Sequence, residues 1–98
     1  MSLHFFVGFE PLSGKEEEFR EEVLRTVEAT RAESGCLAIR LFESIREPLV
    51  FAIHSEWVDE AAFESHAKLP HMVRFLGVAD KLLTHGVQGV RTREIGAA

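Results

Sequence analysis

The sequence of 98 residues predicts one domain, residues 1–98, of the α+β class with a ferredoxin-like split βαβ order. Three observations lead to this fold. Four segments carry the alternating apolar side chains of strands, and the segments between them carry apolar side chains at helical spacing. Their order is β-α-β-β-α-β, which places helices over one face of a four-stranded antiparallel sheet. The length is that of a single domain, and no low-complexity tract interrupts it.

The first strand is predicted over residues 3–9, which are rich in β-formers and end at Glu10-Pro11. A capping box of Ser13 and Glu16 predicts the start of the first helix, and Gly35 is predicted to end it in the left-handed conformation. Alternation places Leu3, Phe5, Val7 and Phe9 on one face of the strand, and His4, Phe6 and Gly8 on the other. The buried stripe of the helix comprises Phe19, Val23, Val27 and Thr30.

Two further strands are predicted over 36–45 and 49–57, joined by a turn at 46–48. The first of them presents Leu37, Ile39 and Leu41 on one face, and Ala38, Arg40 and Phe42 on the other. The second presents Phe51, Ile53 and Trp57 on one face, and Ala52, His54 and Glu56 on the other.

The second helical region is predicted in two pieces. Asp59 is the expected N-cap of a short helix over 60–67, and Pro70 opens a longer helix that ends near His85-Gly86. The longer helix carries an apolar stripe of Met72, Leu76, Ala79 and Leu83, widened by Phe75, Val78 and Leu82. A fourth strand over 87–95 completes the sheet.

Both faces of the predicted sheet carry bulky apolar side chains. Phe5 and Leu41 lie on one face, and Phe6 and Phe42 lie on the other. A single layer of helices covers only one face, and a monomer rarely leaves a large apolar patch exposed. We therefore expect a homodimer in which two sheets pack together.

Composition excludes several classes of partner. Eleven Lys and Arg against sixteen Asp and Glu give a net charge of −5, which argues against nucleic acid and against an anionic membrane surface. No apolar run is long enough to span a bilayer, and the N-terminal residues do not resemble a signal peptide. The lone Cys36 cannot form an internal disulfide, so a reducing, cytoplasmic compartment is expected.

Three histidines are the candidate catalytic bases. His66 and His71 flank the predicted helix break, where ring nitrogens near a cleft can take a substrate proton. His54 lies in mid-strand on the same face as Glu56, a carboxylate that can orient its ring. The structural alternatives are a backbone hydrogen bond for His66, a solvated first turn for His71 and a polar pair at a dimer interface for His54.

Four further residues are candidates for substrate binding. Trp57 can wall an apolar pocket and donate its N–H to a ligand oxygen, although plain core packing is equally expected. Phe63 and Phe75 belong to the same aromatic-rich half of the chain. Arg40 can hold a ligand anion or a glutamate across a dimer interface. No metal site is predicted, because the spacing from His66 to His71 crosses a proline and no Asp or Cys lies between them.

Four strings in the chain resemble the antibiotic biosynthesis monooxygenase family. They are Pro11-x-x-Gly14-Lys15-Glu16-Glu17-Glu18-Phe19, Thr30-Arg31-Ala32-Glu33-x-Gly35-Cys36-Leu37, Glu56-Trp57-x-Asp59-Glu60-Ala61-Ala62-Phe63-x-x-His66 and Pro70-His71. The resemblance runs over almost the whole chain. It implies a dimeric α+β barrel and assigns Trp57 to the lining of a pocket between sheet and helices. His66 and His71 match two histidines of the family strings.

The resemblance also implies an activity. Known members oxidise aromatic polyketides or quinols with O₂ and without metal or flavin, because an electron-rich phenolate can itself pass an electron to O₂. The protein binds the substrate in a dry pocket, removes a proton and stabilises the anion. This chain departs from polyketide-oxidising relatives in having no Asn and no Tyr, and from haem-degrading relatives in having Leu76 where they place an axial His.

The sequence therefore predicts a cofactor-independent monooxygenase that oxidises a small electron-rich aromatic with O₂. Two alternatives stay open. One is an isomerase of a small sugar-like or diketone substrate, for which a base and an Arg clamp suffice. The other is a non-catalytic dimer that binds a small apolar ligand, because a fold does not fix a function.

Overall fold

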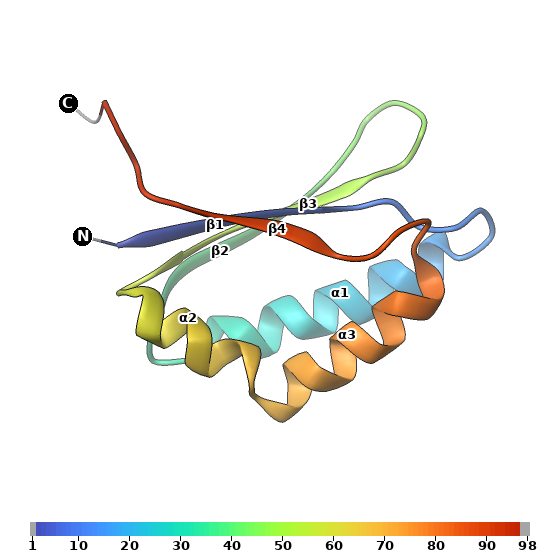
Figure 1. The fold of residues 1–98 in the computed structure, drawn as a ribbon. Helices are drawn as coiled ribbons and strands as arrows, with labels where there is room; N and C mark the ends of the chain where they lie inside the picture. Colours follow the sequence, from blue (N-terminus) through green and yellow to red (C-terminus); the bar gives the residue numbers. More distant parts are fainter. Residues whose placement is uncertain (1, 97–98) are drawn as a thin grey trace.

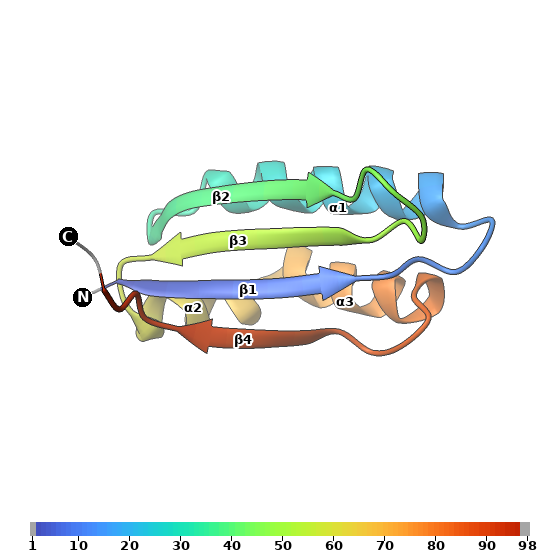
Figure 2. The ribbon, with the colours of Figure 1, turned by 90° about the horizontal axis from the view of Figure 1, so that it is seen from above.

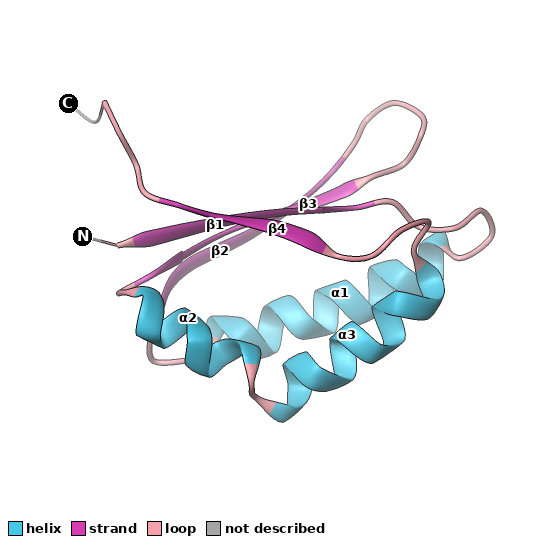
Figure 3. Cartoon of the chain, viewed as in Figure 1, coloured by secondary structure: helices cyan, strands magenta, loops and turns pink. Residues whose placement is uncertain are grey.

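The computed structural model describes residues 2–96 (Figure 1, Figure 3). Its strands are β1 (Leu3–Phe9), β2 (Cys36–Glu43), β3 (Phe51–Trp57) and β4 (Gln88–Thr92). Its helices are α1 (Glu16–Arg31), α2 (Glu60–Ala67) and α3 (Pro70–Leu82). The order along the chain confirms the predicted β-α-β-β-α-β arrangement with a divided second helix.

The four strands form one antiparallel sheet in the order β2-β3-β1-β4 (Figure 2). The two central strands pair along their whole length, from Leu3 opposite Trp57 to Phe9 opposite Phe51. All three helices lie on the same side of the sheet (Figure 1). The predicted ferredoxin-like fold is therefore confirmed.

The core lies between the sheet and the helices. Val7 and Phe9 of β1 and Phe51 and Ile53 of β3 are buried, as their alternation predicted. The buried stripe of α1 is also as predicted, with Phe19 completely buried. The rings of Phe9, Phe19 and Phe75 contact one another at centroid distances of 5.3–6.1 Å, within the range of favourable aromatic pairs.

The opposite face of the sheet is open and partly apolar. Phe6, Phe42 and Val90 lie on it with exposed fractions of 49%, 53% and 61%. The helices cover none of these side chains, since they lie against the other face (Figure 1). The predicted distribution of apolar side chains over both faces is thus confirmed.

Both predicted ends of α1 are wrong. Ser13 does not cap α1, because Gly14 takes a positive φ of 87° and the N-cap is Lys15, two residues after Ser13. The side chain of Glu16 instead accepts a hydrogen bond from the Gly14 N–H. Gly35 is not in the left-handed conformation, and α1 ends earlier, at Arg31. By contrast, Asp59 caps α2 and Pro70 opens α3 as predicted.

Some predicted strand residues lie outside the observed strands, because they have no neighbouring strand to pair with. β4 covers only Gln88–Thr92 of the expected 87–95, in the stretch that pairs with β1. A register shift between Cys36 and Ala38 leaves Leu37 53% exposed. Leu37 therefore does not lie on the same face of the sheet as Ile39, as the alternation predicted. On α3 the buried positions are Phe75, Ala79 and Leu82, and Leu76 of the predicted stripe is exposed.

Within residues 2–96, none of the helices combines the length and the apolar character that crossing a membrane requires.

Candidate active site

A cavity of about 270 Å³ lies between the sheet and the helices. Its walls are mostly aromatic and aliphatic, and they include Phe63 of α2 and Phe75 of α3. Its polar lining residues are Thr26, Thr30, Ser55 and His66. An apolar cavity of about 150 Å³ is enough to hold benzene, so this one has room for a substituted ring or a small fused-ring aromatic.

Most of the polar groups at this cavity already have partners. The hydroxyls of Thr26 and Thr30 donate to backbone carbonyls one helical turn earlier. Ser55 accepts a hydrogen bond of 3.0 Å from the indole N–H of Trp57 and keeps its own proton to donate. His66 is the one residue with an ionisable side chain among those that line the cavity.

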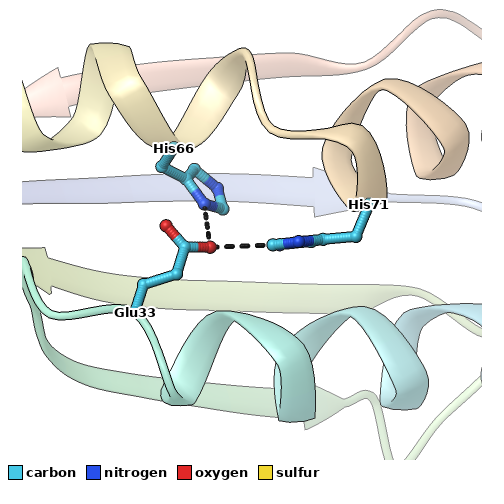
Figure 4. Close-up of side chains that lie close together, drawn as sticks. All are labelled: Glu33, His66 and His71. Carbon is cyan, nitrogen blue, oxygen red and sulfur yellow. Dashed lines mark hydrogen bonds and ion pairs between the residues drawn. The ribbon is translucent and has the colours of Figure 1, made fainter.

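Glu33 joins the two histidines of the helix break (Figure 4). Its Oε2 lies 2.8 Å from Nδ1 of His66 and 3.0 Å from Nε2 of His71. A carboxylate only accepts hydrogen bonds, so Nδ1 of His66 carries a proton and donates it to Glu33. The free lone pair of His66 is then on Nε2, the arrangement of a base that a carboxylate orients.

The surroundings keep the His66 ring neutral and fixed. Burial lowers the pKa of the His66 imidazole below its ordinary value, and the hydrogen bond to Glu33 opposes that effect in part. The ring packs against the indole of Trp57 at a centroid distance of 4.5 Å and against the ring of Phe63 at 5.7 Å. At neutral pH His66 is therefore able to accept a proton.

Local sequence positions each member of this cluster. Glu33 lies in the turn after α1, where its backbone N–H donates to the carbonyl of Thr30. His66 lies in the last turn of α2, and His71 lies in the first turn of α3. Pro70 lacks an N–H and favours the first turn of a helix, so the chain turns between the two histidines and brings both rings to the same carboxylate.

A second, wider cavity of about 570 Å³ lies next to the first. Glu33, Gly35, Trp57 and His66 are among its lining residues. His66 lines both cavities, so its ring stands between the apolar interior and a more polar opening.

The candidate site residues predicted from the sequence fall into two groups. His66, His71, Trp57 and Phe63 lie in one contact cluster, and Phe75 lines the same inner cavity as Phe63. The indole N–H of Trp57 is already bonded to Ser55, so a ligand oxygen would have to displace that contact.

The second group, His54 and Arg40, lies on the open face of the sheet. The two residues are cross-strand partners in the register of β2 and β3. His54 does not contact Glu56 directly. Its Nε2 lies 2.8 Å from Nδ1 of His4, and Nε2 of His4 lies 3.8 Å from the Glu56 carboxylate.

The sequence patterns did not identify Glu33 and Ser55 as candidate functional residues. Glu33 is 33 residues from His66 along the chain, and no local pattern links them. Its only signal was its place in a family-like string. Ser55 gave a clearer signal, because a hydroxyl residue lies on the inward face of a strand between Ile53 and Trp57.

Comparison with known proteins identifies the family of the chain. The family model described as antibiotic biosynthesis monooxygenase matches residues 5–77, a range that includes Glu33, His66 and His71. The chain is 36% identical over 78 residues to "Putative monooxygenase YcnE" of Bacillus subtilis (strain 168), a match that covers 80% of this chain and 82% of that protein.

Solved structures support the fold. Rv0793 from Mycobacterium tuberculosis matches with a TM-score of 0.92 at 21% identity, over 100% of this chain and 99% of that one. PA3566 from Pseudomonas aeruginosa matches with a TM-score of 0.87 at 26% identity, over 97% and 95% of the two chains.

Proposed function

Because the chain belongs to the antibiotic biosynthesis monooxygenase family, we propose that it oxidises a small electron-rich aromatic, such as a quinol, with O₂ and without a metal or flavin. One observation carries this proposal. The inner cavity is mostly apolar, and the single lining residue with an ionisable side chain is His66, whose Nδ1 donates to a carboxylate. Such a cavity binds an aromatic ring and offers it one base.

The reaction begins with proton transfer. Nε2 of His66 takes the proton of an aromatic hydroxyl, and Glu33 stabilises the imidazolium that forms. The aryloxide passes one electron to O₂, and the resulting superoxide and aryloxyl radical combine at a ring carbon. Loss of water from the peroxide leaves a quinone oxygen on that carbon. One oxygen atom enters the product and the other leaves as water, so the equation balances without an added reductant.

The neighbouring residues position the reactants. Phe63 and Phe75 provide walls against which an aromatic ring can pack. The hydroxyl proton of Ser55 is available to the aryloxide oxygen, since that hydroxyl uses only its acceptor side for Trp57. Trp57 in turn contacts the ring of His66 and holds it in place.

The test is oxidation of a naphthohydroquinone under ¹⁸O₂. We expect O₂ uptake above the protein-free rate, one labelled oxygen in the product, and no turnover without O₂. His66→Gln should lower kcat by about 100-fold or more, the size typical of a lost general base. The control His85→Gln changes an exposed histidine outside both cavities and should keep the wild-type rate.

Two outcomes would contradict this proposal. Turnover that continues without O₂ would favour an isomerase. An unchanged rate in His66→Gln combined with loss of activity in His54→Gln would move the chemistry to the open face of the sheet.

We also propose that the chain functions as a homodimer, with the open faces of two sheets packed together. The support is the exposed Phe6, Phe42 and Val90 on that face, together with the dimeric barrel that family membership implies. Pairing would remove these side chains from water, which is the main favourable term in association.

A further inference from the structure

We infer that Glu33, His66 and His71 form a binding site for one divalent transition-metal ion of the Zn²⁺ type. The three side chains come from the turn after α1, from α2 and from the first turn of α3. One ligand atom from each lies within 4.8 Å of the others. Figure 4 shows both imidazoles directed at the carboxylate.

The distances suit a shared ion. Zn²⁺ binds imidazole nitrogen and carboxylate oxygen at about 2.0–2.2 Å, which in tetrahedral geometry places neighbouring ligand atoms about 3.3–3.6 Å apart. The two nitrogens lie 2.8 and 3.0 Å from Oε2 of Glu33. An outward movement of the nitrogens by about half an ångström would therefore make room for the ion between them and the carboxylate.

His71 provides an independent reason to expect a ligand. Its Nε2 is buried, yet it has no hydrogen-bond partner among the described residues. The ring approaches the Glu33 oxygen without the geometry of a hydrogen bond, so the contact is an ion pair only when His71 is protonated. A metal ion would use this lone pair, which is otherwise buried without a partner.

The ligand chemistry selects the ion. Two imidazole nitrogens with one carboxylate oxygen suit Zn²⁺, Co²⁺ and related ions, whereas Mg²⁺ and Ca²⁺ prefer oxygen ligands. Three protein ligands leave at least one coordination position for water. The cavity of about 570 Å³, which Glu33 and His66 line, gives access to that position.

Metal binding also predicts an effect on the proposed oxidation. The ion would occupy Nδ1 of His66, and the ring proton would then have to lie on Nε2, the atom that acts as the base in the proposed function. Zn²⁺ should therefore inhibit the oxidation. This consequence rests on the proposed function, but the binding itself does not.

The experiment measures binding of Zn²⁺ alone to the chelator-treated full chain by titration calorimetry, and of Co²⁺ by visible absorption. We expect one ion per chain, a Co²⁺ ligand-field band and no binding of Mg²⁺. His71→Ala and Glu33→Gln should each weaken Zn²⁺ binding by about tenfold or more. Circular dichroism verifies that each variant is folded.

His54→Ala is the matched control, because His54 and His4 form the other close imidazole pair in the described residues. Its affinity for Zn²⁺ should equal that of the wild type. Absence of Zn²⁺ binding, or binding that survives His71→Ala and is lost in His54→Ala, would overturn the inference. Because no substrate is present, these results stand apart from the test of the oxidation.

Discussion

Gly35 shows how one small residue holds the candidate site together. A Cβ added at this position would lie 2.6 Å from Cβ of Ala62 in α2, closer than side chains approach in folded proteins. The helix that carries His66 therefore packs directly on the backbone of the turn that carries Glu33. Position 35 requires glycine because there is no room for a side chain, and not because the backbone takes a left-handed conformation.

Gly35→Ala should destabilise the protein by about 1–3 kcal/mol, the usual cost of overpacking. The matched control is Gly77→Ala in α3, where an added Cβ meets nothing within 4 Å. That change should stabilise the protein by about 0.5–1 kcal/mol, because alanine favours helix. Urea unfolding measures both. Equal stability of Gly35→Ala and the wild type would contradict the close packing.

Residues with local roles were predictable from the sequence, and those with distant partners were not. Asp59 caps α2 through the N–H of Ala62, three residues away, so a short motif identifies it. The contact between Glu33 and His66 exists only after α1 and α2 have packed. Gly35 fitted the pattern of a helix end, but its neighbour across the fold determines its role.

At the scale of elements, an ion pair joins the two long helices. Arg74 of α3 donates two hydrogen bonds, of 2.6 and 3.2 Å, to the carboxylate of Glu22 in α1. These bonds are the main reason why the pKa of Glu22 lies below its ordinary value. The pair stabilises the packing of α3, whose first turn carries His71, against α1.

The pH dependence of this pair follows from the sign of the shift. Since folding lowers the pKa of Glu22, the stabilisation is complete above the ordinary glutamate pKa and disappears as the pH falls through the folded value. Arg74→Gln should lower Tm at pH 7 by a few degrees. The difference from the wild type should shrink below about pH 4.

The control for this experiment is Arg93→Gln, which changes an exposed arginine beyond the end of β4. It should leave Tm nearly unchanged at both pH values. A Tm difference for Arg74→Gln that persists at pH 3 would mean that the stabilisation does not come from the ionised Glu22.

The helices and strands themselves were largely predictable. Each of them buries one face, and the spacing of apolar residues along the sequence indicates which face that is. Alternation of apolar residues identified β1 and β3 as strands and indicated their buried faces. Helical spacing did the same for α1 through Phe19, Val23 and Val27. The limits of β4 were not predictable, since they depend on how far β1 extends beside it. The exposure of Leu37 was not predictable either, because it results from a register shift of β2 against β3.

At the scale of the whole molecule, the sheet separates two environments. The helices cover one face and enclose the cavity with His66, while the other face carries Phe6, Phe42 and Val90 together with His54. The sequence predicted both faces, but it did not show which histidines share a face with the cavity. The structure assigns His66 to the cavity and His54 to the open face.

The proposed dimer gives a direct prediction. Phe42→Glu should convert the protein to a monomer in light scattering after size exclusion, because it places a charge within the proposed apolar contact. Leu24→Glu is the control, since Leu24 is 48% exposed on α1, away from the open face. A monomeric wild type, or an undisturbed dimer in Phe42→Glu, would contradict sheet-to-sheet pairing.

We propose that an aromatic substrate binds in the cavity beside His66. The most direct measurement is ¹⁵N NMR of the five histidine side chains during titration with 1-naphthol, in metal-free protein. We expect saturable shifts of the ring nitrogens of His66, with unchanged signals from His54 and His85. Saturable shifts at His54 with none at His66, or no saturable binding, would contradict it.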